Sequence, residues 1–125
     1  MKKSFTKDKP LYIQVRETIE DMILNDQLQE GEQAPSTNQL VQFFKINHLT
    51  VSKGVNQLVE EGILYKKRGI GMFVAEGAKK KLMEKRKQTF VDDYVVQLVQ
   101  EANKLHISLE EIIDLIKQVK GREKK

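Results

Sequence analysis

The chain has 125 residues, a formal net charge of +4 and no cysteine. This length provides one modest hydrophobic core, or a small domain with an appendage, and the charge slightly favours anionic partners. The missing cysteines exclude a disulfide framework and a thiolate metal site. No apolar run approaches the roughly 18 residues of a membrane span. We therefore expect a soluble, cytoplasmic protein that has no membrane partner.

The N-terminal part predicts an arm followed by one helix. Residues 1–8 are basic and polar, and are expected to form a loose arm. Pro10 suits the first turn of a helix, and the helical pattern after it ends near Asn25. Residues 26–35 form a connector with a glycine as its turn residue. The apolar positions at helical spacing are Tyr12, Val15, Ile19, Met22 and Ile23.

Two short helices follow in quick succession. Ser36 and Gln39 match a capping box, in which each side chain hydrogen-bonds the backbone amide of the other residue. The helix that they open reaches Phe44. Asn47 then caps a second helix, which ends at Gly62 because glycine adopts the left-handed conformation at low cost. Two helices joined this tightly predict a helix-turn-helix unit.

The second of these helices has two different faces. Its apolar face consists of Val51, Val55, Leu58 and Val59. The opposite face has no carboxylate, and all its polar side chains can donate hydrogen bonds: Thr50, Lys53, Asn56 and Gln57, with Leu49 and Ser52 at the margins. Such a face suits the phosphates and base edges of a DNA major groove. An ordinary solvated face fits this helix about equally well.

Gly54 interrupts the interior of the same helix, where glycine costs about 0.5–1 kcal/mol relative to alanine. Its position beside the apolar face predicts that another helix approaches closely here. We expect alanine to be tolerated at this position and leucine to unfold the domain.

A β-hairpin is predicted after this helix. Residues 63–75 contain two short β-branched and aromatic runs, separated by a turn at residues 68–71. Directly after a helix-turn-helix, we interpret the hairpin as a wing, in which cations meet phosphates and a glycine lets the backbone approach a duplex. A plain hairpin with solvated charges is the alternative. The residues at its tip are Lys66, Lys67, Arg68 and Gly69.

The last third of the chain predicts a charged segment and two helices. Cations crowd residues 79–87, so this segment is expected to lie outside any core. Apolar side chains between Val91 and Leu105 recur at spacings of four and three, which predicts a helical seam of two heptads. A second capping box, formed by Ser108 and Glu111, opens a final helix that ends at Gly121.

We expect these two helices to pack antiparallel and to form a homodimer interface. A lone pair of short helices is only marginally stable, and this pair carries more apolar surface than the two helices can cover. Packing of the two helices on each other alone is the alternative. The predicted interface residues are Val91, Tyr94, Val95, Leu98, Ala102, Leu105, Ile112, Ile113 and Ile116.

No motif of an enzyme or a metal centre is apparent. His48 and His106 lie in different predicted domains and lack metal-ligand spacing. The carboxylates form no paired pocket, and no serine or threonine lies in a nucleophile motif. We therefore expect no enzymatic activity, no metal and no cofactor. His48 is interpreted as an exposed, solvated histidine, with a phosphate contact near a helix N-terminus as the alternative.

Three ordered stretches resemble the winged helix-turn-helix domain of the GntR family of bacterial transcription regulators. They are residues 10–15, the Pro35-Ser36 pair with its capped helix, and residues 47–62 leading into residues 69–74. The resemblance covers about residues 8–75. The two remaining helices look like those of the YtrA subfamily, whose short C-terminal part serves dimerisation.

The resemblance implies a mainly α fold with a small β-hairpin. A winged helix-turn-helix DNA-binding domain spans residues 1–76, and a helical hairpin that serves as a two-helix dimerisation region spans residues 77–125. The implied function is sequence-specific regulation of transcription, as a repressor, with a neighbouring transporter operon as the target. Because a two-fold axis sets two such helices against two half-sites, the operator is expected to be an inverted repeat.

Individual positions also match the family. Lys53 corresponds to the basic residue of its recognition helix, and Gly69 to the wing-tip glycine that approaches the minor groove. Asn38 replaces the arginine that usually follows the Pro-Ser pair. The expected contacts to double-stranded DNA are Ser36, Asn38, Asn47, His48, Leu49, Thr50, Ser52, Lys53, Gln57, Lys66, Lys67, Arg68 and Gly69. The alternatives are a winged-helix adaptor between proteins, or a small-molecule sensor with a cleft between subunits; the sequence identifies no effector.

Overall fold

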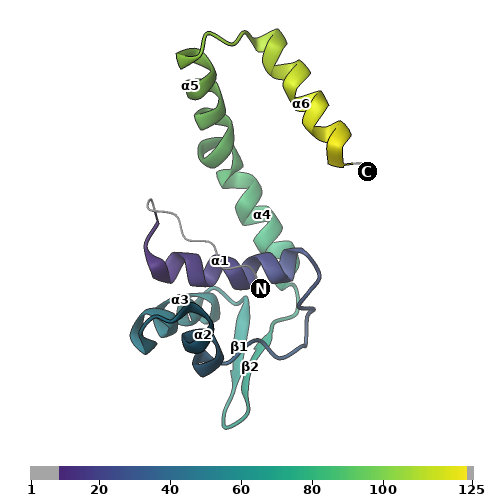
Figure 1. Cartoon of the computed structure of the whole chain (residues 1–125). Coiled ribbons are helices and arrows are strands. Elements are labelled where there is room, and N and C mark those ends of the chain that lie inside the picture. The colour runs from purple at the N-terminus through teal and green to yellow at the C-terminus, as the bar shows by residue number, and fades with distance from the viewer. Residues whose placement is uncertain (1–8, 124–125) are drawn as a thin grey trace. The chain divides into compact units, whose positions relative to one another are not determined.

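The computed structural model describes residues 9–123 and divides into two compact units, Met1–Lys85 and Arg86–Lys125. The predicted N-terminal arm, residues 1–8, lies outside the described residues. The fold is mainly helical with one two-stranded antiparallel hairpin, which confirms the fold class predicted from the sequence (Figure 1).

Three helices open the first unit: α1 (Leu11–Leu24), α2 (Thr37–Phe44) and α3 (His48–Glu60). Both predicted N-caps are confirmed. The Ser36 hydroxyl accepts a hydrogen bond from the Gln39 amide at 3.1 Å, while the Gln39 side chain accepts one from the Ser36 amide at 2.9 Å. The Asn47 side chain accepts a hydrogen bond from the Thr50 amide at 2.8 Å.

The hairpin consists of β1 (Leu64–Lys67) and β2 (Gly71–Val74), paired from Leu64–Val74 to Lys67–Gly71. The connector after α1 runs along the outer edge of β2, where the Ala34 amide donates to the Met72 carbonyl at 2.8 Å. This pairing satisfies backbone groups that a free strand edge would leave exposed. In Figure 1, α2 and α3 lie on one side of the hairpin, and its tip points away from α1.

The core of the first unit is formed by the apolar stripes of the three helices and the inner side of the hairpin. Its fully buried side chains include Val15, Ile19, Ile23, Leu40, Val51, Val55, Leu58, Leu64 and Val74. Gly54 is also buried, and a Cβ atom added there would overlap the main-chain carbonyl of Tyr12 in α1. The predicted close approach of a second helix is confirmed. The expectation that alanine is tolerated is wrong, because the obstacle is backbone.

Helix α4 (Ala78–Phe90) corrects another expectation, namely that its cationic segment lies outside any core. Ala78 and Leu82 have no exposed surface and belong to the core of the first unit. Two apolar residues four positions apart suffice to attach one side of a helix, while its cations occupy the other sides. The two compact units therefore meet after Lys85, not after Glu76 as expected from the sequence.

The second unit continues with a π-helical turn, Val91–Val95, and the helices α5 (Val96–Lys104) and α6 (Leu109–Glu123). The predicted second capping box is confirmed, since the Glu111 amide donates to the Ser108 hydroxyl at 3.2 Å. Helix α6 runs past Gly121, where the sequence pattern predicted its end. Within a single chain α5 and α6 diverge from their turn, so the expected close antiparallel packing is not formed (Figure 1).

The π-helical turn was not predicted, and it interrupts the two-heptad seam. The Val96 amide donates to the carbonyl of Val91, five residues earlier, in place of the usual four. Such a turn inserts an extra residue into the helix. The seam therefore does not pass through residues 91–95 with regular α-helical spacing.

Candidate nucleic-acid interface

Helix α3 presents one continuous exposed ridge. Leu49, Lys53, Asn56 and Glu60 are exposed at spacings of four, three and four residues, whereas Thr50 and Ser52 beside them are half-buried. Along this ridge Lys53 offers an ammonium and Asn56 an amide, whereas Glu60 in the last turn of α3 offers a carboxylate. The N-terminal part of α3 is therefore the part suited to polyanions. Asn56 belongs to this ridge, although it was not among the DNA contacts expected from the sequence.

Several polar side chains at the start of α3 are held by neighbours. The Lys53 ammonium lies 4.1 Å from the ring centroid of Tyr12 in α1, a cation–π distance that restrains its position. The His48 Nδ1 and Ser52 Oγ atoms are 3.3 Å apart, and the histidine tautomer decides which of them donates. The side-chain Oδ1 atom of Asn47 serves as the helix cap. The side-chain NH₂ group is therefore the part of Asn47 that is suited to meet DNA.

The hairpin tip is a second cationic surface. Lys66 and Arg68 are exposed, and neither forms an ion pair with any residue between 9 and 123. The Lys67 ammonium instead lies 4.4 Å from the ring centroid of Phe73. Gly69 has a φ of +80°, and an added Cβ atom would meet nothing within 4 Å. The backbone at the tip is therefore open to close approach.

A groove of about 410 Å³ connects this tip to the start of α2. Ser36 and Thr37 line one side of the groove, and Lys66 and Arg68 line the other. Gln33 holds the tip in place, since its side-chain amide donates to the Ile70 carbonyl at 3.2 Å. The N-terminus of a helix and three cations, Lys66, Lys67 and Arg68, share this groove, a combination that suits a phosphate group. Asn38 is exposed in the first turn of α2.

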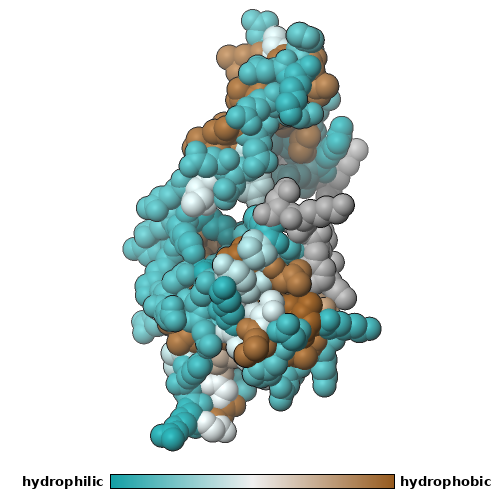
Figure 2. All heavy atoms as spheres, turned by 90° about the vertical axis from the view of Figure 1, so that its left-hand side faces the viewer, coloured by the Kyte–Doolittle hydropathy of each residue, from teal (hydrophilic) through white to brown (hydrophobic). Residues whose placement is uncertain are grey.

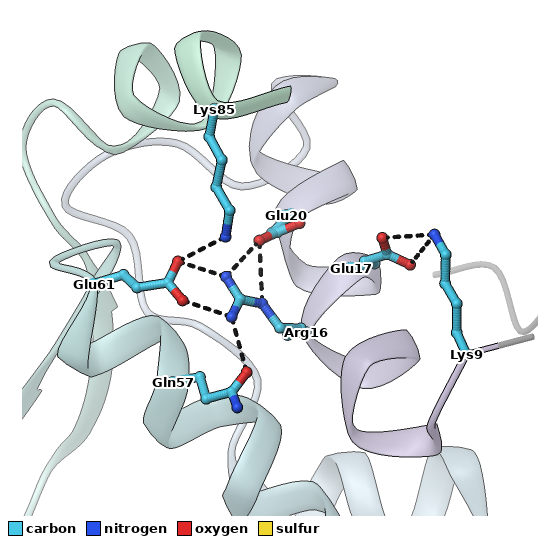
Figure 3. A network of polar contacts seen from close by, with 7 residues as sticks. All are labelled: Lys9, Arg16, Glu17, Glu20, Gln57, Glu61 and Lys85. Atoms are coloured by element: carbon cyan, nitrogen blue, oxygen red, sulfur yellow. Dashed lines mark hydrogen bonds and ion pairs between the residues drawn. The ribbon is translucent and has the colours of Figure 1, made fainter. Parts of the chain in front are cut away.

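Gln57 differs from the other predicted contacts because its side chain is directed toward α1. Its carbonyl oxygen accepts a hydrogen bond from the Arg16 Nη1 atom at 2.9 Å. Arg16 also donates to both carboxylate oxygens of Glu61 at 2.6 Å and pairs with Glu20 at 3.0 Å (Figure 3). Lys85 of α4 adds a 3.0 Å ion pair to Glu61. Gln57 is thus engaged in a network that joins α1, α3 and α4.

The network shifts the pKa values of its two central groups. Hydrogen bonding to Glu61 raises the pKa of the Arg16 guanidinium above its usual value despite burial. Hydrogen bonds from Arg16, supported by Lys85, lower the pKa of Glu61 from 4.5 to about 2. The sequence analysis missed this network. The available signal was a charged pair at i, i+4, Arg16 and Glu20, next to the apolar stripe of the first helix.

Within residues 9–123, no three histidine or carboxylate side chains gather closely enough to hold a metal ion. None of the helices in that range combines the length and the apolar character needed to cross a bilayer.

Comparison with known proteins identifies the family. Residues 11–74 match the model of the bacterial regulatory proteins of the gntR family. The chain belongs to the GntR family. It is 31% identical to the transcriptional repressor YtrA of Bacillus subtilis over 110 residues, which cover 88% of this chain and 84% of that protein. GntR proteins of this kind are transcriptional regulators and not enzymes, as the sequence analysis predicted.

Solved structures extend the comparison with the GntR family. A GntR regulator from Bacteroides thetaiotaomicron superposes with a TM-score of 0.67 and 32% identity, covering 90% of this chain and 98% of that one. The DNA-binding domain of AraR, solved in complex with its operator ORX1, superposes with a TM-score of 0.53 and 32% identity. That match covers 60% of this chain and 92% of the AraR domain. This GntR protein is therefore a winged-helix, DNA-binding regulator of transcription.

Proposed function

We propose that this protein is a homodimeric repressor that binds an inverted-repeat DNA operator. A regulator of transcription has to reach the chromosome, so we place it in the cytoplasm. The proposal assigns operator contact to α2, α3 and the hairpin tip, and dimerisation to α5 and α6. The observation that carries it is the combination of the exposed α3 ridge with two exposed cations at the tip, Lys66 and Arg68, which form no ion pair with residues 9–123.

The proposed DNA contacts are divided between phosphates and bases. The tip cations and the start of α2 meet phosphates, which fixes the position of the domain on the duplex. The first three turns of α3 meet base edges in the major groove, through Lys53 and Asn56. Glu60 limits how far along α3 this contact extends, because its carboxylate repels the phosphate backbone. Gln57 supports the orientation of α3 through Arg16.

The proposed dimer rests on the apolar surface of the second unit. Within its described part, residues 86–123, Ala102 alone among the apolar side chains is buried, at 3% exposure. Figure 2 shows brown apolar side chains reaching the surface over the C-terminal helices at the top of the view. Helices this short depend on tertiary packing for their stability. A second copy supplies that packing.

A groove of about 490 Å³ between α5 and α6 gives the partner a place to dock. Its lining includes Leu98, Ala102, Leu105, Ile112, Ile116 and Val119, and its polar residues are Glu101, Lys120 and Glu123. A small-molecule site usually combines an apolar cavity with a few converging polar groups. A nearly continuous aliphatic lining suits the apolar face of a helix better, so we assign the groove to the partner subunit.

The test is binding of the full-length protein to DNA selected by the protein from a random pool, followed by fluorescence anisotropy at several salt concentrations. We expect an inverted repeat and a steep decrease of affinity with salt, because each neutralised phosphate releases counterions. Arg68→Gln should flatten the slope of log K against log [salt] by about one for each half-site. Lys117→Gln, which removes an exposed cation from α6, is the matched control and should leave the slope unchanged.

Two outcomes would contradict the proposal. Selection that yields no consensus sequence would exclude an operator-binding function. A consensus without two-fold symmetry would exclude the homodimer on an inverted repeat, while leaving sequence-specific binding in place.

A further inference from the structure

Leu49 is unusually exposed for a large aliphatic side chain. It is the second residue of α3, and 81% of its surface is accessible to solvent, more than for any other large apolar residue between 9 and 123. The other aliphatic side chains of α3 point to the opposite side of the helix and are buried or half-buried in the core. Leu49 contributes nothing to that core.

The surroundings of Leu49 are polar on the exposed side of α3. Lys53 and Asn56 continue the same ridge, and the His48–Ser52 pair lies beside it. In the unbound protein, a leucine in this position leaves its apolar surface in contact with water, which is unfavourable. The residue is therefore best explained by a partner that covers it. The polar neighbours restrict that partner to a surface that is mostly hydrogen-bonding and locally apolar.

A DNA major groove has one apolar feature of this kind. Among the four bases, only thymine presents a methyl group in the major groove, beside its hydrogen-bonding O4 atom. Leu49 is an aliphatic side chain at the N-terminal end of a ridge that continues with the Lys53 ammonium and the Asn56 amide, and this combination matches such a mixed edge. We infer that Leu49 is a specificity-determining residue, which selects a thymine in each half-site by contact with its 5-methyl group. The inference rests on the proposed operator-binding function.

Ile70 provides an internal comparison. It is also a large exposed aliphatic residue, at 64% exposure, but it lies at the hairpin tip and not on α3. The 5-methyl group projects only into the major groove. Truncation of Ile70 should therefore leave the recognition of that methyl group intact, whereas truncation of Leu49 should abolish it.

The experiment replaces each thymine of the selected operator by deoxyuridine, symmetrically in both half-sites and one position at a time. Deoxyuridine keeps every hydrogen-bonding group and removes only the methyl. For the wild-type chain we expect one position at which Kd increases by about fourfold for each half-site, the effect of losing one buried methyl-sized group. Leu49→Ala should bind the thymine operator more weakly and show no penalty for deoxyuridine at that position. Ile70→Ala should keep the full penalty.

Circular dichroism and urea unfolding of Leu49→Ala should match the wild type, because the side chain makes no core contact. If the protein binds DNA sequence-selectively but no thymine is sensitive to loss of its methyl group, the inference about Leu49 is wrong while the proposed function stands. The same holds if the wild type and Leu49→Ala show an equal deoxyuridine penalty. If the wild-type chain selects no DNA sequence, the proposed function fails, and the role of Leu49 fails with it.

Discussion

Among single residues, Arg16 has the most demanding position in the first unit. Its guanidinium is buried, with 7% of the side chain exposed, and the ion pairs with Glu20 and Glu61 compensate for the water that it loses. Removing one partner of a buried charge is more costly than removing the pair, because the remaining charge stays desolvated. Glu61 is the partner through which the network reaches α3 and α4.

We expect Glu61→Gln to lower the free energy of unfolding at pH 7 by about 1–2 kcal/mol. This is less than the roughly 3–5 kcal/mol for breaking a fully buried pair, because Glu61 is partly exposed and Glu20 remains. The folded-state pKa of Glu61, about 2, lies below its ordinary value of 4.5. The stabilisation by the carboxylate is therefore complete above about pH 5 and is lost as the pH falls toward 2. Urea unfolding of both chains at several pH values measures this difference.

Glu60→Gln is the matched control, since it removes the same charge from the neighbouring exposed position, which forms no ion pair with any residue between 9 and 123. Its stability should follow that of the wild type at every pH. A gap between wild type and Glu61→Gln that stays constant from pH 7 to pH 2 would show that the carboxylate is not the source of the stabilisation.

Gly54 gives a second prediction at this scale. Alanine should improve the intrinsic helix propensity of α3 by about 0.5–1 kcal/mol, yet its Cβ atom would overlap the Tyr12 carbonyl. Because the main chain of α1 has to move, we expect Gly54→Ala to destabilise the protein by about 1–3 kcal/mol, as overpacking does. Gly121→Ala in α6 is the control, with nothing within 4 Å of the new atom, and should be neutral or stabilising. Equal urea midpoints for the two variants would contradict this explanation.

Among the elements, α4 is the one whose role changes most between sequence and structure. It completes the core of the first unit with Ala78 and Leu82, and ion pairs from Lys79 to Asp26 and from Lys85 to Glu61 fasten it at both sides. A fragment that ends at Glu76 lacks these four residues of α4: Ala78, Lys79, Leu82 and Lys85. The winged helix-turn-helix is therefore incomplete without the first two turns of α4.

We expect a fragment of residues 1–87 to be more stable than a fragment of residues 1–76. The difference should be at least the roughly 2–5 kcal/mol that truncation of a buried leucine costs. Urea unfolding followed by circular dichroism compares the two fragments, and Leu82→Ala in the longer one isolates the contribution of that side chain. Indistinguishable unfolding of the two fragments would mean that α4 is dispensable for the core.

The sequence predicted those features that depend on neighbouring residues. The caps at Ser36, Asn47 and Ser108 and the glycine end of α3 are local, because each is decided within a few positions. The burial of Leu82 and the Arg16–Glu61 pair join residues far apart in the chain, and no spacing rule reports them. The exposed ridge of α3 lies between these cases. Periodicity predicted the face, but only packing against α1 distinguished Asn56, which is exposed, from Gln57, which is engaged by Arg16.

For the whole molecule, the two units differ in the source of their stability. The first unit buries the apolar faces of four helices and a hairpin within one chain. The second unit leaves nearly all of its aliphatic side chains accessible and contains a groove lined by them. A contiguous apolar surface that is exposed in this way is typical of an interaction site between proteins. In the proposed dimer, the stability of this unit depends on protein concentration, because association would supply the missing burial.

Leu98 tests this link, since it is 44% exposed in the single chain and lines the groove between α5 and α6. Leu98→Asp would place an unpaired carboxylate in an apolar interface, at a cost of at least about 3 kcal/mol, which is more than about a hundredfold in the dimer dissociation constant. Sedimentation velocity should show a monomer at concentrations at which the wild type is a dimer. Binding to the full operator should fall to the weak level expected for one half-site. Gln100→Asp adds the same charge to an exposed position of α5 that does not line the groove, and should remain dimeric. A dimeric Leu98→Asp with normal operator affinity would exclude the groove as the interface.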